Sequence, residues 1–370
     1  MAYLDHNATT PMAAEAKAAV AAAMDMPGNA SAQHAHGRAA SKLVNDARSA
    51  VSLAMGVCRD DLYFTSSGTE ADNMAVFSAW KAGCRTLLFS HADHPATYRA
   101  AEQWGCPHEF IPVDRSGVTD IDWLRDRLES QEARGGRVFV SCAAANSETG
   151  VIQPVEAIAD LVKEYDGLLL VDAVQALGKL PMTYMADYLS VSAHKMGGPK
   201  GVGALYAAPD APLESLLCGG GQEKRKRAGT LNTPGIAGFG AAAEVLGDLE
   251  HTRALRDELE RELQALEPKV VILGKDASRL PNTSLFGLPG VSSQTLMMGL
   301  DLAGVSVSTG TACSSGAVGA SRAAEVMGLG DTLDKGVLRV SFGRTSTQDD
   351  LDALLTAWRK VRRISKEIAA

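Results

Sequence analysis

The sequence has 370 residues, of which 46% are hydrophobic and 22% charged, and its formal net charge is −8. These values are typical of a globular chain of about two domains, and the acidic balance argues against a nucleic-acid-binding protein, which needs a basic face. No apolar run approaches the roughly 20 residues that span a bilayer, and the N-terminus lacks the pattern of a signal peptide, so we expect a cytoplasmic protein without membrane contact.

Strand and helix patterns alternate through the first two thirds of the chain, after an extended arm over residues 1–13. We expect helices over 13–24, 41–55, 71–81, 96–104, 120–130 and 155–165. Between them we expect strands over 62–65, 86–90, 110–113, 138–142, 168–172, 188–191 and 202–207. This alternation predicts an α/β fold with a mostly parallel sheet and helices on both faces, forming a large domain over 14–250.

The pattern changes near His251. We predict a smaller α+β domain over 251–370, with the N-terminal arm packed against it. Its expected strands are 270–273, 283–286, 305–308 and 337–342, and its expected helices are 293–302, 320–327 and 348–368.

One lysine occupies an unusual loop. The strand that ends near Val191 leads into Ser192, His194 and Lys195, and several glycines follow directly. Sites in α/β proteins are built at such strand ends, and a lysine there can form a Schiff base with a carbonyl cofactor. The alternative is an ordinary solvated loop lysine.

A second strand end favours the cofactor interpretation. Four apolar residues precede Asp172, which indicates a buried parallel strand that ends in an acid. A buried carboxylate is costly without a charged partner, and a protonated pyridine nitrogen is such a partner. The loop 66–70 between a strand and a helix adds a potential phosphate site, although Ser67 or Thr69 could equally serve only as a helix cap.

The six cysteines include no Cys-x-x-Cys pair, so the sequence gives no support for a zinc or redox motif and we expect no metal. Cys313 differs from the others because it lies in a thin, polar loop, 306–319. We therefore predict that Cys313 is the reactive cysteine of the chain. The alternative is a loop cysteine without a chemical role.

Five motifs together resemble the cysteine desulfurases of the NifS/IscS type, which depend on pyridoxal 5′-phosphate (PLP) and belong to the class-V aminotransferases of PLP fold type I. They are Tyr3-Leu-Asp-His-Asn-Ala-Thr-Thr-Pro11, Asp172-Ala-Val-Gln175, Ser192-Ala-His194-Lys195, Gly198-Pro-Lys-Gly201 and Arg339-Val-Ser-Phe-Gly-Arg344. The resemblance covers essentially the whole chain. It implies conversion of L-cysteine to L-alanine, with the sulfur retained as a persulfide on Cys313 and supplied to iron–sulfur cluster or related biosynthesis.

The resemblance also implies roles for the cofactor-binding residues. Lys195 would hold PLP and act as base at Cα, Asp172 would keep the ring nitrogen protonated, and Gln175 would bind the 3-hydroxyl. His94 would stack on the ring, with an acid–base role left open and His91 as its competitor. The phosphate would be held by Gly68, Thr69, Ser192 and His194.

Other implied roles concern the substrate and the partner subunit. Arg344 would bind the substrate carboxylate. In a homodimer, Arg227 would lie at the interface and Thr230 would reach the phosphate in the neighbouring subunit. The family usually has two adjacent asparagines where this chain has Asn146 and Ser147, so either residue could contact cofactor or substrate.

Two alternatives to cysteine desulfurase remain from the sequence. One is a selenocysteine lyase or another PLP-dependent β-lyase on the same scaffold, and the other is a sulfur carrier without PLP. We expect a sulfur-acceptor protein as partner, an iron–sulfur scaffold being one candidate. The sequence ends at Ala370 without the longer tail of scaffold-binding relatives.

Overall fold

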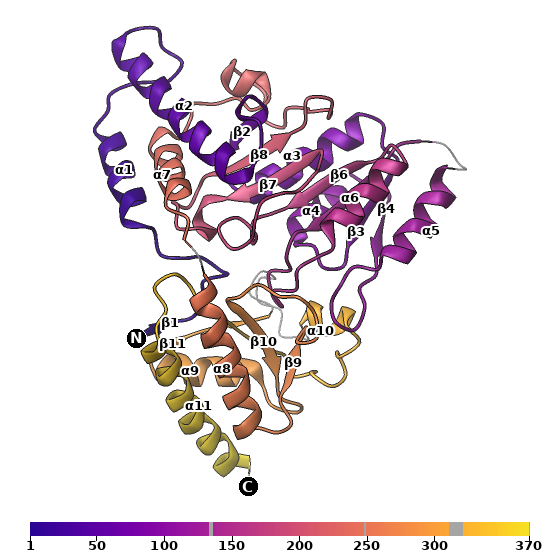
Figure 1. Ribbon diagram of the computed structural model, residues 1–370, viewed down its shortest axis with the longest axis vertical. Coiled ribbons are helices and arrows are strands. Elements are labelled where there is room, and N and C mark those ends of the chain that lie inside the picture. Colours follow the sequence, from indigo (N-terminus) through magenta and orange to yellow (C-terminus); the bar gives the residue numbers. More distant parts are fainter. Residues whose placement is uncertain (133–135, 248, 311–320, 370) are drawn as a thin grey trace.

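The structure is a computed structural model that describes residues 1–370 apart from 133–135, 248, 311–320 and 370. Figure 1 shows two bodies, with a large sheet and its helices above and a smaller sheet with α8, α9 and α11 below.

The large body is built on a seven-stranded sheet with the order β2-β8-β7-β6-β5-β3-β4. Only β8 runs antiparallel to its neighbours, so the sheet is mostly parallel, as the strand–helix alternation predicts. The central strands are buried along their whole length. The strands are β2 (Leu62–Thr65), β3 (Thr86–Ser90), β4 (His108–Ile111), β5 (Val138–Ala143), β6 (Leu168–Asp172), β7 (Tyr188–Ser192) and β8 (Gly203–Ala207).

Helices cover both faces of this sheet because successive strand residues point to opposite sides. In β6, Leu169 packs in the core formed with α2, α5, α6 and α7, whereas Leu168 packs in the core formed with α3 and α4. The helices are α1 (Ala14–Met24), α2 (Ala35–Met55), α3 (Gly68–Lys81), α4 (Pro95–Gln103), α5 (Ile121–Glu132), α6 (Val155–Glu164) and α7 (Thr233–Glu244).

Two helices begin earlier than the hydrophobic pattern predicts, and each has a side-chain cap. The His34 side chain accepts from the backbone N–H of Gly37 and starts α2 at Ala35. Ser67 accepts from the backbone N–H of Glu70 and starts α3 at Gly68. Capping side chains bond orphan N–H groups of the first turn, which apolar periodicity alone does not reveal.

The smaller body has a four-stranded antiparallel sheet with the order β12-β13-β10-β9. Its core includes Leu259, Phe286 and Trp358. The strands are β9 (Val271–Leu273), β10 (Thr283–Gly287), β12 (Ser308–Thr309) and β13 (Leu338–Ser341), and the helices are α8 (Glu250–Leu266), α9 (Ser293–Leu302), α10 (Arg322–Val326) and α11 (Gln348–Ala369).

The N-terminal arm joins the two bodies. Its strand β1 (Ala2–Tyr3) pairs in parallel with β11 (Val305–Ser306) of the smaller body, beside which the N-terminus lies in Figure 1. The arm then reaches the large body, where the backbone N–H of Thr10 donates to the carbonyl of His194. The arm therefore passes directly beside the Lys195 loop.

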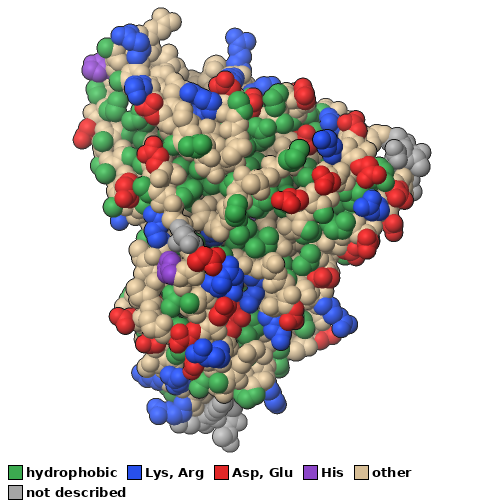
Figure 2. All heavy atoms as spheres, in the orientation of Figure 1, with side chains coloured by type: hydrophobic (Ala, Val, Ile, Leu, Met, Phe, Trp, Pro, Cys, Tyr) green, Lys and Arg blue, Asp and Glu red, His purple; other side chains and the backbone are tan. Residues whose placement is uncertain are grey.

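Within the described residues, no helix combines the length and the apolar character needed to cross a membrane. Acidic and basic side chains intermix over the smaller body on the face drawn in Figure 2.

Candidate active site

The candidate site residues meet at one edge of the large sheet. The parallel strands β3, β5, β6 and β7 end there, and β2 ends there too because it is antiparallel to β8, itself antiparallel to β7. The last residues of these strands and the segments that follow them carry ten of the residues singled out in the sequence: Gly68, Thr69, His94, Asn146, Ser147, Asp172, Gln175, Ser192, His194 and Lys195.

Lys195 ends a single 3₁₀ turn that follows β7. Its Nζ donates to the backbone carbonyl of Asn7 at 2.6 Å and to that of Ala8 at 2.9 Å. A solvated loop lysine would extend into water, whereas this amine is held against the N-terminal arm.

Asp172 is buried at the end of β6, and its Oδ1 accepts from the backbone N–H of Val174 at 2.9 Å. Burial raises the pKa of Asp172 to about 6, although the Val174 hydrogen bond and the charge of Lys195 oppose this rise. A cation placed against this carboxylate would remove the penalty of burying it.

The start of α3 packs closely against the ends of β6 and β7. A Cβ on Gly68 would lie 2.6 Å from Val174 Cγ2, so only glycine fits between α3 and the loop after β6. The same position is 3.6 Å from Ser192 Cβ, which brings the end of β7 to the first turn of α3. Free N–H groups and the helix dipole at such a position favour a phosphate.

His94 caps α4, and its Nδ1 accepts from the backbone N–H of Ala96 at 3.1 Å. Burial lowers the pKa of His94 to about 4, helped by the positive charge of Lys195. The ring is therefore neutral at physiological pH and carries its proton on Nε2. The competing His91 already stacks on Phe110, with ring centroids 4.8 Å apart.

Asn146 and Ser147 hold the loop after β5. Asn146 Oδ1 accepts from the backbone N–H of Thr149 at 2.8 Å, and its Nδ2 donates to the carbonyl of Ala92 at 2.8 Å. The backbone carbonyl of Ser147 accepts from Arg339 Nη1 at 3.0 Å. Both positions thus lie between the large body and β13.

Gln175 and His194 both contact the arm. Gln175 Nε2 donates to the carbonyl of Asn7 at 3.0 Å. His194 Nδ1 lies 3.2 Å from Thr9 Oγ1. The arm is therefore part of the site, not only a connection to the smaller body.

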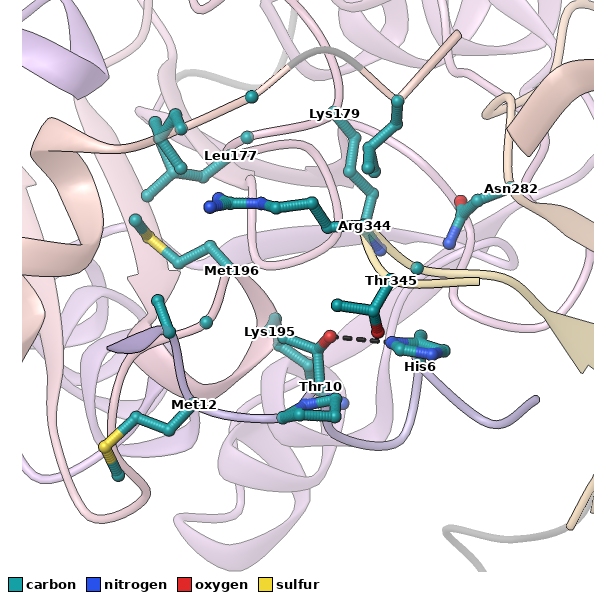
Figure 3. Close-up of a pocket in the computed structure, with 18 of the residues that line it drawn as sticks. His6, Thr10, Met12, Leu177, Lys179, Lys195, Met196, Asn282, Arg344 and Thr345 are labelled. Atoms are coloured by element: carbon teal, nitrogen blue, oxygen red, sulfur yellow. Dashed lines mark hydrogen bonds between the residues drawn. The ribbon is translucent and has the colours of Figure 1, made fainter. Parts of the chain in front are cut away.

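Two cavities open onto these residues. A cavity of about 230 Å³ is lined by Lys195 and Arg344, and its lining is drawn in Figure 3. A second cavity of about 220 Å³ is lined by His94, Asn146 and Arg339.

The two arginines differ in environment. Arg344 is exposed, and in Figure 3 its guanidinium extends toward Leu177 and Met196. The Arg339 side chain is only 4% exposed, and its Nη2 lies 2.8 Å from Asp5 Oδ1. Its Nε is buried and has no hydrogen-bond partner among the described residues.

Several residues of the site have no role in the sequence-based prediction. Asn7 and Arg339 lie in motifs that carry the family resemblance, and nothing else in the sequence indicated that they belong to the site. Asp93 and Glu148 are acids whose pKa is raised by burial to about 7. Lys179 donates to Gln175 Oε1 at 2.6 Å.

Three predicted residues lie apart from the others or outside the description. Thr230 is in an exposed loop. Arg227 binds Glu70 through an Nε–Oε1 contact of 2.9 Å, which anchors that loop to α3. Cys313 lies outside the described residues.

These features fit PLP. The N-terminal end of α3 suits a phosphate, the buried Asp172 carboxyl suits a protonated ring nitrogen, and the Lys195 amine suits an aldehyde. Lys195 and Arg339 also both lower the pKa of Lys179, so positive charge converges here and an anionic group would neutralise it.

Comparisons with known proteins agree with this fit. The family described as "Aminotransferase class-V" matches residues 2–354. A cysteine desulfurase of Cereibacter sphaeroides is 40% identical, covering 95% of this chain and 93% of its own length. The cysteine desulfurase IscS of Dictyoglomus turgidum is 36% identical, covering 97% of this chain and 94% of its own.

A solved NifS-like protein from Rickettsia africae superposes with a TM-score of 0.89 at 31% identity, over 98% of this chain and 99% of that one. These matches confirm the predicted fold, the predicted enzyme class and PLP as cofactor, and they do not favour the selenocysteine lyase or β-lyase alternative. The chain therefore belongs to the class-V aminotransferase family and, within it, to the PLP-dependent cysteine desulfurases of the NifS/IscS type.

Proposed function

We propose that this cysteine desulfurase acts through Lys195, with Asp172 at the ring nitrogen of the cofactor, His94 stacked on the ring face and Cys313 as the sulfur acceptor. The observation that carries the proposal is the meeting of Lys195, the buried acid Asp172 and the N-terminal end of α3 at one sheet edge. Bound PLP supplies the electron-withdrawing ring that makes the Cα proton of L-cysteine acidic.

The residues of the chain place and move protons around that centre. Lys195 holds the cofactor at rest and, once released by the substrate, takes the Cα proton. Asp172 keeps the ring nitrogen protonated, since this pairing offsets the cost of its burial. Neutral His94 offers an aromatic face for stacking and an Nε2 proton to donate.

The remaining cofactor contacts follow the same geometry. Gly68, Thr69, Ser192 and His194 would hold the phosphate around the start of α3. Gln175 would donate to the 3-hydroxyl through the second N–H of its amide nitrogen, since Oε1 accepts from Lys179 and the first N–H donates to the Asn7 carbonyl. Asn146 and Ser147 would flank the ring and substrate from the loop after β5.

The substrate carboxylate has two candidate partners. Arg344 is the arginine proposed from the sequence, and it shares a cavity with Lys195. Arg339 is the second candidate, because it is buried beside Ser147, lines the cavity of His94 and has an unpartnered Nε. A buried guanidinium with a spare donor is well suited to a carboxylate.

Cys313 would complete the reaction. Its thiolate attacks the sulfur of L-cysteine, the substrate carbon–sulfur bond breaks, and an S–S bond forms, which leaves L-alanine and a Cys313 persulfide. No external oxidant or reductant is required.

The test is the variant Cys313→Ser in the loaded enzyme. We expect it to bind PLP like the wild type but to produce no L-alanine from L-cysteine, because a hydroxyl cannot accept sulfur. Wild-type chain treated with L-cysteine should gain one sulfur on the peptide that contains residue 313, measured by mass spectrometry. Alanine production by Cys313→Ser at the wild-type rate would refute the assignment. Cys218→Ser, at an exposed cysteine of the described residues, is the control.

We further propose a homodimer in which Thr230 completes the phosphate site of the partner subunit and Arg227 supports its loop. The support is that Thr230 is exposed, whereas the other proposed phosphate ligands gather at the sheet edge. Mixing inactive Lys195→Ala chains with Thr230→Ala chains should restore activity, because mixed dimers contain one site with both native residues. Recovery that does not exceed the sum of the separate chains would contradict site sharing.

Three wider proposals accompany this function. Residues 14–250 and 251–370 would form separate domains, with 1–13 packing on the second, and their separate hydrophobic cores support this division. The sulfur would pass to an acceptor protein, for which an iron–sulfur scaffold is one candidate. Persulfide chemistry favours a reducing compartment such as the cytoplasm.

A further inference from the structure

Lys179 lies beside Lys195 in the cavity of Figure 3, but the proposed reaction gives it no part. Its Nζ donates to Asn7 Oδ1 at 3.0 Å and to Gln175 Oε1 at 2.6 Å. None of the ion pairs found among the described residues includes Lys179. Enclosed lysines usually pair with a carboxylate, so two neutral amide oxygens are unusual partners.

The pKa of Lys179 is shifted in the direction that suits these neutral partners. Burial lowers its pKa well below the ordinary value, and repulsion from Lys195 and Arg339 lowers it further. Its amine makes two hydrogen bonds, and both acceptors are amide oxygens. Lys179 is therefore placed to orient the side chains of Asn7 and Gln175 through these two hydrogen bonds.

Asn7 receives the Lys179 bond and is fixed on its other sides by the smaller body. Its backbone N–H donates to Ser341 Oγ at 2.9 Å, and its Nδ2 donates to Thr283 Oγ1 at 2.8 Å. Its Oδ1 also accepts from Asn282 Nδ2 at 3.1 Å. With backbone and side chain both held, the orientation of the Asn7 carbonyl is fixed as well.

That carbonyl faces the catalytic lysine. Lys195 Nζ donates to the carbonyls of Asn7 and Ala8 at 2.6 and 2.9 Å, and Gln175 Nε2 donates to the same Asn7 carbonyl at 3.0 Å. The two carbonyls therefore form a receiving site for the Lys195 amine.

We propose that Lys179 is a positioning residue that acts through Asn7 to hold the carbonyls of Asn7 and Ala8 where they receive the Lys195 amine whenever it is not bonded to the cofactor. The proposal rests on the proposed role of Lys195. Each catalytic cycle releases this amine and requires its return, and a fixed docking point keeps it within reach of the same carbon atom.

The test measures cofactor binding instead of activity alone. Cofactor-free wild type, Lys179→Met, Asn7→Ala and the double variant are titrated with PLP and followed by visible absorbance. Methionine keeps the length of the side chain but has no N–H donor. We expect each single variant to lower the dissociation constant about tenfold, because the carbonyl pair stabilises the amine only while it is not bonded to the cofactor.

The double variant decides whether the two residues act as a unit. If Lys179 works through Asn7, the double variant should bind PLP about as tightly as Asn7→Ala alone, and any small further change belongs to the Lys179–Gln175 contact. A change of about a hundredfold in the PLP dissociation constant, which is the product of the two single effects, would overturn the proposal. So would Lys179→Met binding within twofold of the wild type.

Two controls separate positioning from folding. Lys179→Arg keeps donors and has room in the adjoining cavity, so it should bind PLP within about threefold of wild type. Lys163→Met removes an exposed lysine of α6 and should change nothing. If Lys179→Met lowers only the thermal midpoint of the cofactor-free chain, its role is structural and the proposal fails.

Failure of this inference is distinguishable from failure of the proposed function. Borohydride reduction fixes PLP to the lysine that holds it, and peptide mass spectrometry identifies that lysine. Label on Lys195 with no effect of Lys179→Met rejects only the positioning role. Label on another lysine rejects the assignment of Lys195 itself.

Discussion

The two sheets contribute to the site in different ways. In the large sheet, β5, β6 and β7 are apolar along most of their length, and their functional groups come at or after their carboxyl ends. In the smaller sheet, polar residues such as Thr283, Arg339 and Ser341 lie within the strands and are buried. The large sheet thus presents chemistry at its edge, whereas the smaller sheet holds polar partners for the arm and for the cleft.

The comparison shows that a search for polar residues at the ends of strands finds only the half of such a site that lies on the large sheet. Residues at the edge of the parallel sheet follow from topology, since parallel strands must end together. Buried polar groups within an antiparallel sheet have a purpose only when a distant segment covers them, and here that segment is the arm.

The largest effect should come from the edge of the large sheet. Lys195→Ala should abolish covalent attachment of PLP, because no amine remains at that strand end. After borohydride reduction, the mass of the variant chain should show no added cofactor. The control Lys200→Ala removes an exposed lysine nearby and should retain attachment. Full covalent labelling of Lys195→Ala would place the cofactor elsewhere.

The next effect separates the two arginines and so tests the role of the smaller sheet. If Arg339 binds the substrate carboxylate, Arg339→Lys should raise the KM for L-cysteine roughly 10- to 100-fold, because lysine cannot form a bidentate contact. Arg344→Lys should then change KM less than about threefold.

The opposite result would assign the carboxylate to Arg344 and leave Arg339 as the partner of Asp5 and Ser147 only. Cofactor titrations of both variants serve as controls, since neither change should weaken PLP binding more than about twofold.

A smaller effect concerns the packing of β8 against the start of α3. A Cβ on Gly203 would lie 2.6 Å from the backbone carbon of Ser67 and 2.9 Å from Gly68 N. Gly203→Ala should therefore push β8 away from the start of α3 and cost about 1–3 kcal/mol of unfolding free energy. Denaturant unfolding measures this loss, and Gly221→Ala, where a Cβ meets nothing within 4 Å, is the matched control. Equal stability of the two variants would contradict the crowding.

The smallest expected effect is a change in pH dependence. Burial raises the folded-state pKa of Asp93 to about 7, whereas an unfolded aspartate titrates near pH 3.9. The folded state therefore keeps a proton that the unfolded state has lost, so the stabilisation is complete below about pH 4 and disappears as pH rises through 7.

Asp93→Asn removes this titration. Its thermal midpoint relative to wild type, both without cofactor, should be about 2–4 °C higher at pH 8 than at pH 5. Asp114→Asn, in a turn at the surface, should show no such trend. A parallel response of Asp93→Asn and wild type across this pH range would mean that Asp93 does not bind the proton.

The sequence predicts the fold and the sheet-edge residues because both depend on local pattern. Asp172 and Lys195 each follow a recognisable strand, and the alternation of strands and helices fixes that these strands end side by side. The start of α3 was predicted three residues late, because the cap at Ser67 depends on hydrogen bonding and not on apolar spacing.

The remainder of the site could not be predicted because its partners are far apart in the sequence. Asn7 contacts Thr283 and Ser341 across 276 and 334 positions, and no periodicity in the arm indicates either contact. Arg339 was visible only as part of a motif, since its burial and its unpartnered Nε are properties of the assembled cleft.

The arm's long-range contacts also set the order in which the enzyme can mature during synthesis. Asn7 leaves the ribosome well before its partner Ser341, which follows 334 positions later. At roughly 5–20 residues per second, the arm waits on the order of 20–70 s before β13 exists. The large sheet can fold in that interval, whereas the Lys195 docking point cannot. The site therefore forms last, and nascent chains that capture cofactor earlier would do so without the carbonyl pair that receives the lysine.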